Sequence, residues 1–105
     1  MQNWTPQELA NQLTNATKQI QLLDVREPWE YQIVHLENSV LVPLSQLTYG
    51  LNELNKDLPV VVICHHGIRS AHACYLLERL GFQAINLTGG IDRWAREIDP
   101  SIPIY

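Results

Sequence analysis

The sequence has little positive charge and no long apolar run. Its 105 residues hold seven lysines and arginines against eleven aspartates and glutamates, which gives a formal net charge of −4. An acidic chain without a basic run is not typical of nucleic-acid binding. No stretch approaches the ~20 apolar residues of a membrane span, and residues 1–4 lack the basic and apolar regions of a signal peptide. We therefore expect a cytoplasmic protein that binds neither nucleic acid nor membrane.

Cysteine is also scarce, since only Cys64 and Cys74 are present. Two cysteines without a secretory signal indicate free thiols in a reducing compartment. The histidines near Cys64, namely His65, His66 and His72, are candidate metal ligands. Adjacent side chains on an extended loop diverge, however, and neither a CxxC nor an HExxH spacing occurs. We therefore predict no metal site and no other cofactor.

The remaining composition is that of an ordinary globular protein, with 46% hydrophobic and 17% charged residues. At this length we expect one domain, spanning residues 1–105, and a monomer. The residue patterns predict strands at 20–25, 39–42, 60–63 and 84–87, and helices at 6–15, 27–33, 44–54, 70–80 and 91–98. Because strands alternate with helices, we expect an α/β fold. It is a three-layer α/β/α arrangement around a central, mainly parallel sheet of about five short strands.

Residues 60–70 are the most informative stretch. Four β-branched residues at 60–63 predict a strand buried on both faces, and this strand ends at Cys64. Helical periodicity restarts at Ser70, so Cys64 faces the amino end of a helix, at the edge where open α/β sheets bind ligands. That helix end carries roughly half a positive charge, and Gly67 can adopt φ > 0, which lets loop amides turn inward. This setting favours the reactive thiolate.

Cys64 also has a simpler interpretation. A cysteine that ends a buried strand is most often a small hydrophobic residue of the core. The strand–loop–helix context favours the reactive interpretation, because Arg69, and His65 or His66 when protonated, would surround the thiol with positive charge. We therefore predict that Cys64 is a catalytic nucleophile.

Three blocks of sequence occur in a recognisable order. They are residues 23–31 (LDVREPWEY) with 35–36 and 42–44, residues 64–70 (CHHGIRS), and residues 80–82 (LGF) with 87–90 (LTGG) and Trp94. In order and spacing these blocks resemble the rhodanese (thiosulfate sulfurtransferase) family, specifically its small single-domain members. The resemblance covers about residues 20–98 and implies a rhodanese-like fold.

The resemblance implies a persulfide mechanism. The Cys64 thiolate would attack the outer sulfur of a sulfane donor such as thiosulfate and release sulfite. The persulfide sulfur would then pass to cyanide or to a thiol, such as that of a thioredoxin-like or other sulfur-accepting protein, in a second half-reaction. Arg69 would orient the sulfonate end of the donor. The substrate-binding residues that the resemblance implies are His65, His66, Gly67, Ile68, Arg69 and Ser70.

Two other functions are open at this point. One is a rhodanese-like module that binds or carries sulfur for a partner with slow turnover of its own. The other is a phosphatase or arsenate reductase, because related enzymes of those classes resemble this fold, although they place five residues between cysteine and arginine. Here Cys64 and Arg69 enclose only four residues, and Ile63 stands where those phosphatases have histidine. The smaller ring favours sulfur over a phosphoryl group.

Four positions depart from the family pattern. Val34 stands where a glycine usually precedes His35, and Asn38 and Ser39 replace a Gly-Ala pair in turns away from the cysteine. His65 occupies a position that is often arginine, which weakens the fixed positive charge of the loop. We therefore expect activity with thiosulfate to be low, or to depend on pH near the histidine pKa of ~6.5.

Asp24 and Arg26 end a strand on the side of the sheet where Cys64 lies. They either line the site or form a structural ion pair, in which Arg26 would meet Glu30 of the following helix. We favour the structural ion pair, because charged residues at strand ends commonly pair.

Four further residues are assigned roles from the sequence. We expect His35 to be a hydrogen-bonded scaffold residue rather than a catalytic one. Cys74 is expected to pack in the core, and a disulfide to Cys64 is the alternative. Trp94 is expected in the core as well. Trp29 is either an exposed contact for a partner or a packing residue, and the sequence does not distinguish the two.

Overall fold

The computed structural model describes residues 1–15 and 19–105, and its centre is a parallel sheet of five strands. The strands lie in the order β1-β5-β4-β2-β3, and each neighbouring pair is parallel. They are β1 (Gln2–Trp4), β2 (Gln21–Asp24), β3 (Ser39–Leu41), β4 (Val60–Ile63) and β5 (Ala84–Leu87). The strand order reverses between β2 and β4, and such a switch point is where α/β sheets bind ligands.

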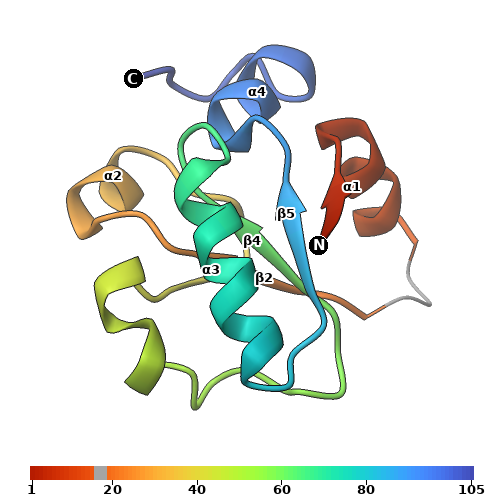
Figure 1. The fold of residues 1–105 in the computed structure, drawn as a ribbon. Helices are drawn as coiled ribbons and strands as arrows, with labels where there is room; N and C mark the ends of the chain where they lie inside the picture. Colours follow the sequence, from red (N-terminus) through yellow and green to blue (C-terminus); the bar gives the residue numbers. More distant parts are fainter. Residues whose placement is uncertain (16–18) are drawn as a thin grey trace.

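Helical segments cover both faces of this sheet. They are α1 (Pro6–Leu13), α2 (Pro28–Ile33), the 3₁₀ helix η1 (Leu44–Tyr49), α3 (Ile68–Arg79) and α4 (Gly90–Glu97). Helix α3 and η1 pack on one face, and α1 and α4 pack on the other (Figure 1). The three-layer α/β/α prediction is confirmed. Within residues 1–15 and 19–105, no helix combines the length and apolarity needed to cross a membrane.

The side chains of β4 alternate between two hydrophobic cores. Val60 and Val62 point into the core under α3, whereas Val61 and Ile63 point into the core under α1 and α4. All four are fully buried, which is why the strand is β-branched throughout and shows no polar alternation. The same alternation places Cys64 on the α3 side, close to the amino end of that helix.

The predicted helix at 44–54 is wrong in type and length. A 3₁₀ helix covers Leu44–Tyr49, and turns without helix follow it. Leu47 is buried and Leu51 and Leu54 pack against the same core, so the leucine spacing did identify the apolar face. The helix ends at Gly50, since glycine is a weak helix former. A larger residue would not fit at this position, because a Cβ there would lie 2.6 Å from Val42 Cγ1.

Two other boundaries differ from the sequence prediction. Helix α3 begins at Ile68 rather than Ser70, because Gly67 adopts φ of 100° and turns the chain directly into the helix. Leu80, predicted on the buried face of α3, lies just beyond the helix and is 41% exposed. Strand β1, with Trp4 as its one apolar residue, is too short to show a pattern and was not predicted individually.

A buried ion pair closes the carboxyl end of β2. Arg26 and Asp24 are both fully buried, and Arg26 Nη2 lies 2.7 Å from Asp24 Oδ2. The prediction that Arg26 meets Glu30 is wrong in its partner, since Arg26 reaches only the backbone oxygen of Glu30, at 3.4 Å. Arg26 also donates to the Val34 carbonyl at 2.7 Å, so it ties the strand end to the segment that follows α2.

Replacing Arg26 should therefore destabilise the protein strongly. We expect Arg26→Met to lower the free energy of unfolding by about 3–5 kcal/mol, because it leaves the Asp24 carboxylate buried without a counter-charge. Urea denaturation measures this change. The control is Arg96→Met, which removes an exposed (i, i+4) pair on α4 and should cost no more than about 0.5 kcal/mol. Equal losses in the two variants would contradict the expectation.

Candidate active site

The thiol of Cys64 lies between two polar groups at the end of β4. The backbone N–H of Gly67 donates to Sγ over 3.0 Å, and Ser70 Oγ lies 3.2 Å from the same sulfur. Gly67 is the N-cap of α3, so its amide belongs to the positive end of that helix. The sequence predicted several inward amides, whereas among the described residues the Gly67 amide is the one that donates to Sγ.

Cys64 is only 1% exposed and belongs to the core under α3, so burial alone fits the core interpretation. Cys74 shows what a core cysteine looks like in the same molecule. It is fully buried, and burial, with the nearby Glu78 and Cys64, raises the pKa of its thiol to about 12. Both cysteines are free thiols. The two polar contacts to Cys64 Sγ set it apart from Cys74.

A chain of buried hydrogen bonds continues from Cys64 through Ser70 to Asn86 on β5. Ser70 Oγ donates to Asn86 Oδ1 over 2.5 Å, and Asn86 Nδ2 donates to the Gly67 carbonyl over 3.3 Å. The second bond fixes which end of the amide faces Ser70, because a carbonyl needs a donor. A hydroxyl has one proton, so while Ser70 gives it to Asn86, the Cys64 thiol is the donor to Ser70 Oγ.

The N-terminus of α4 holds the other side of the loop. The N–H of Ile91 donates to the Cys64 carbonyl over 2.9 Å, and that of Asp92 donates to the His65 carbonyl over 3.1 Å. Gly90 adopts φ of 64°, and a Cβ at this position would collide with both of those carbonyl groups. The glycine pair of the third sequence block therefore lets the loop backbone rest on the first turn of α4.

Arg69 is engaged by a carboxylate rather than free. Its Nη1 and Nη2 donate to Glu30 Oε1 and Oε2 over 2.6 and 2.9 Å, a bidentate pair between α3 and α2. The Glu30 side chain is 4% exposed, and Arg69 holds the pKa of its carboxyl down to about 2. The same ion pair raises the pKa of the Arg69 guanidinium. Arg69 thus lies beside the loop with its charge balanced.

Three aromatic rings stack beside the loop. The His65 ring lies 4.0 Å from the Tyr105 ring on one side and 4.0 Å from the His66 ring on the other. The Tyr105 hydroxyl accepts from Arg26 and donates to Glu30, each over 2.8 Å. Burial and repulsion from His66 lower the pKa of His65, which favours the neutral ring. His65 therefore adds less positive charge to the site than an arginine at this position would.

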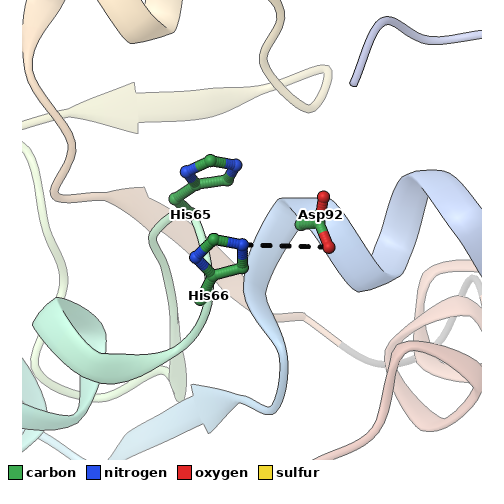
Figure 2. A group of neighbouring side chains, drawn as sticks. All are labelled: His65, His66 and Asp92. Atoms are coloured by element: carbon green, nitrogen blue, oxygen red, sulfur yellow. Dashed lines mark ion pairs between the residues drawn. The ribbon is translucent and has the colours of Figure 1, made fainter. Parts of the chain in front are cut away.

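His65, His66 and Asp92 form a group that resembles a metal site (Figure 2). Their ligand atoms lie within 4.8 Å of one another, and His66 Nε2 is 3.9 Å from Asp92 Oδ2. The two imidazole planes are nearly parallel, however, at 19°. A metal ion must lie in the plane of each ring that binds it, and Arg96 already donates to Asp92 Oδ2 over 3.0 Å. This geometry would have to change before an ion could bind.

The structure also places three residues that the sequence singled out away from the sulfur. His35 is hydrogen-bonded through Nδ1 to the Tyr31 carbonyl at 2.8 Å and stacks on the Tyr31 ring, as expected for a scaffold residue. Asn38 adopts φ of 66°, which explains how it replaces a glycine, since asparagine tolerates the left-handed region. Trp29 is 60% exposed and packs edge-on against Tyr105.

The sequence does not predict the observed roles of three residues of the site. Asn86 is the one polar residue in the apolar strand β5, and that signal was available. The sequence pairs Glu30 with Arg26 because charged residues at strand ends commonly pair, whereas its partner Arg69 lies 39 positions away. Tyr105 is 79 positions from Arg26, and no local pattern connects the two.

Comparison with known proteins gives consistent matches over nearly the whole chain. The family model for the rhodanese-like domain matches residues 5–97. "Probable adenylyltransferase/sulfurtransferase MoeZ" of Mycobacterium tuberculosis is 38% identical over 104 residues, which cover 96% of this chain and 26% of MoeZ. YqhL of Bacillus subtilis is 39% identical over 82 residues, or 77% of this chain and 65% of YqhL. The chain thus spans about a quarter of the length of MoeZ.

A solved structure agrees over its full length. The crystal structure of a rhodanese-like domain protein from Staphylococcus aureus superposes with a TM-score of 0.86 at 32% sequence identity. The match covers 100% of this chain and 99% of the other. The sheet order and the position of the Cys64 loop at its carboxyl edge are therefore those of a shared fold.

The contact between Gly90 and the loop gives a test of this geometry. We expect Gly90→Ala to lower the free energy of unfolding by about 1–3 kcal/mol for backbone strain and by about 1–3 kcal/mol more for the collision with the loop. Gly81→Ala is the matched control, because Gly81 also has positive φ but a Cβ there meets only the Lys56 side chain, at 3.9 Å. Urea denaturation of both variants separates the two contributions. Equal losses would mean that the loop does not rest on Gly90.

Proposed function

The chain belongs to the rhodanese-like domain family, and we propose that it is a sulfurtransferase that moves a sulfane sulfur through a persulfide on Cys64. One observation carries this proposal. Of the two buried thiols, Cys64 alone receives a hydrogen bond from a helix N-terminus and contacts a hydroxyl, and both partners can stabilise a negative sulfur. The name of MoeZ includes sulfurtransferase, which supports the same reaction class.

The first half-reaction uses the contacts around Sγ. Loss of the thiol proton leaves the Ser70 hydroxyl free to turn from Asn86 towards the sulfur, so that Ser70 and the Gly67 amide both donate to the thiolate. The thiolate attacks the terminal sulfur of the donor, and the S–S bond of the donor breaks. The electron pair leaves with the donor residue, which is sulfite when the donor is thiosulfate. Cys64 persulfide remains in the loop.

In the second half-reaction a thiol acceptor removes the outer sulfur. The acceptor thiolate attacks that sulfur, and the electron pair of the breaking S–S bond returns to Cys64. The acceptor is a small thiol or the cysteine of a sulfur-accepting protein. A sulfur carrier that turns over slowly without its partner is the second candidate, and the burial of Cys64 favours it.

Mass spectrometry of the intact protein tests the reaction. We expect incubation with a sulfane donor to add ~32 Da, one sulfur atom, and dithiothreitol to remove it. Cys64→Ala should abolish the added mass, whereas Cys74→Ala, which removes the other buried thiol, should retain it. Rapid loss of the sulfur to cyanide favours the enzyme, and slow loss favours the carrier. An adduct that persists in Cys64→Ala would refute the proposal.

The hydroxyl of Ser70 should stabilise the negative sulfur of Cys64. We expect Ser70→Ala to slow persulfide formation about 10- to 100-fold, because a hydrogen bond to a charged group contributes about 1.5–3 kcal/mol. Ser70→Thr keeps the hydroxyl and should retain the wild-type rate. The measurement is the rate of formation of the ~32 Da adduct. Identical rates for Ser70→Ala and wild type would exclude this role.

A further inference from the structure

The pairing of Arg69 with Glu30 bears on which donors the site accepts. Both guanidinium Nη atoms are engaged by the carboxylate, and the Glu30 side chain is 4% exposed whereas that of Arg69 is 36% exposed. The Glu27 N–H and the Tyr105 hydroxyl also donate to that carboxylate, over 3.0 and 2.8 Å. An arginine held in this way has little net charge to offer a second anion, because its field is cancelled by a carboxylate 2.6 Å away.

The other arginines around the loop are also balanced. Arg26 is paired with Asp24, Arg96 with Asp92, and Arg93 with Glu97. In the part of the chain that the structure describes, no arginine without a carboxylate partner lies beside the Cys64 loop. The remaining positive potential comes from the N-termini of α3 and α4, each of which amounts to roughly half an elementary charge. The amides of Ile91 and Asp92 in α4 donate to the carbonyls of Cys64 and His65, so the end of α3 is the one that faces the sulfur.

Sulfane donors differ in the charge that they bring to this sulfur. Thiosulfate is a dianion, so its attack by a thiolate gathers three negative charges at the loop. A thiosulfonate, R–SO₂–S⁻, carries the same transferable sulfur on a monoanion and gathers only two. An organic persulfide in its R–S–SH form gathers one. With no unpaired arginine beside the loop, the electrostatic cost of the transition state is highest for thiosulfate, lower for the thiosulfonate and lowest for the persulfide.

We propose that Glu30, by neutralising Arg69, makes this site select sulfane donors that carry at most one negative charge over the thiosulfate dianion. The inference rests on the proposed function, because it concerns the donor of the Cys64 persulfide. Glu30 acts through Arg69 and touches no reacting atom. It is a residue that determines donor specificity.

The favoured step balances in atoms and charge. The Cys64 thiolate forms a bond to the terminal sulfur of R–S–SH, and the S–S bond of the donor breaks. The electron pair leaves with the R–S⁻ group, which takes up the proton of the terminal sulfur and departs as R–SH. Cys64–S–S⁻ keeps the single negative charge. One sulfur has moved at the oxidation level of a sulfane, with no oxidant or reductant consumed.

Two donors that differ by one charge test the proposal. Methanethiosulfonate and thiosulfate both deliver a terminal sulfur to Cys64 and leave as methanesulfinate and sulfite. We expect the ratio of their kcat/KM values, with cyanide as acceptor, to favour methanethiosulfonate in the wild type. In Glu30→Gln the ratio should fall about tenfold. Arg69 would then lack its carboxylate partner and would attract thiosulfate, which raises kcat/KM for the dianion about tenfold relative to that for the monoanion.

The matched control is Glu37→Gln. It removes the same formal charge from an exposed residue shortly after the same helix, and it should leave the donor ratio at the wild-type value. Thermal denaturation verifies that Glu30→Gln remains folded. A ratio unchanged in Glu30→Gln, with kcat/KM for both donors altered equally, would show a merely structural role for Glu30 and overturn the proposal.

A measurement on the wild-type protein keeps the test valid if Glu30→Gln fails to fold. A site with a free cation loses attraction for an anion as salt is added, so kcat/KM for thiosulfate would fall. For the neutralised site on a chain of net charge −4 we expect kcat/KM to rise or stay constant between low and high salt. A fall would overturn the proposal. If neither donor forms the Cys64 persulfide, the proposed function itself fails.

Discussion

Two helix N-termini hold the loop that follows β4, and the rest of the site depends on this arrangement. The first amide of α3 donates to Cys64 Sγ, while the first amides of α4 donate to the carbonyls of Cys64 and His65. Both helices begin at the same edge of the sheet because β4 and β5 are parallel neighbours, and each helix follows its strand. The sulfur and the carbonyl oxygens thus receive donors from different helices, which gives the loop a defined shape.

The charges around the loop are arranged in pairs that stiffen it without adding net potential. Asp24 and Arg26 close the end of β2, Glu30 and Arg69 join α2 to α3, and the Tyr105 hydroxyl links the two pairs. Buried ion pairs contribute little net stability compared with apolar packing, but removal of one partner is costly. Their effect here is positional, since they hold the residues that surround the loop in one arrangement.

The sequence predicts the layers of the fold and the position of Cys64 at the end of a buried strand well, because both depend on local patterns. The β-branched run before Cys64 and the glycine at position 67 report directly on a buried strand and a left-handed turn. The partner of Arg69 was not predictable in this way. A charged side chain pairs with the opposite charge that lies nearest in space. The fold brings the Glu30 carboxylate closer to Arg69 than to Arg26. The leucine spacing after Pro43 indicated burial correctly but not the 3₁₀ geometry, because both helix types bury similar faces.

Loop length and charge give independent arguments about the chemistry at Cys64. Four residues between Cys64 and Arg69 make a small ring, which limits the size of the group that can enter. A phosphoryl group would also bring two negative charges, and it would need an unpaired cation to receive them. Arg69 is the residue at the position for that role, and its guanidinium is already bound by Glu30. A single sulfur atom is smaller than a phosphoryl group and fits the smaller ring. Its one negative charge needs no unpaired arginine, because the N-terminus of α3 donates a hydrogen bond to it.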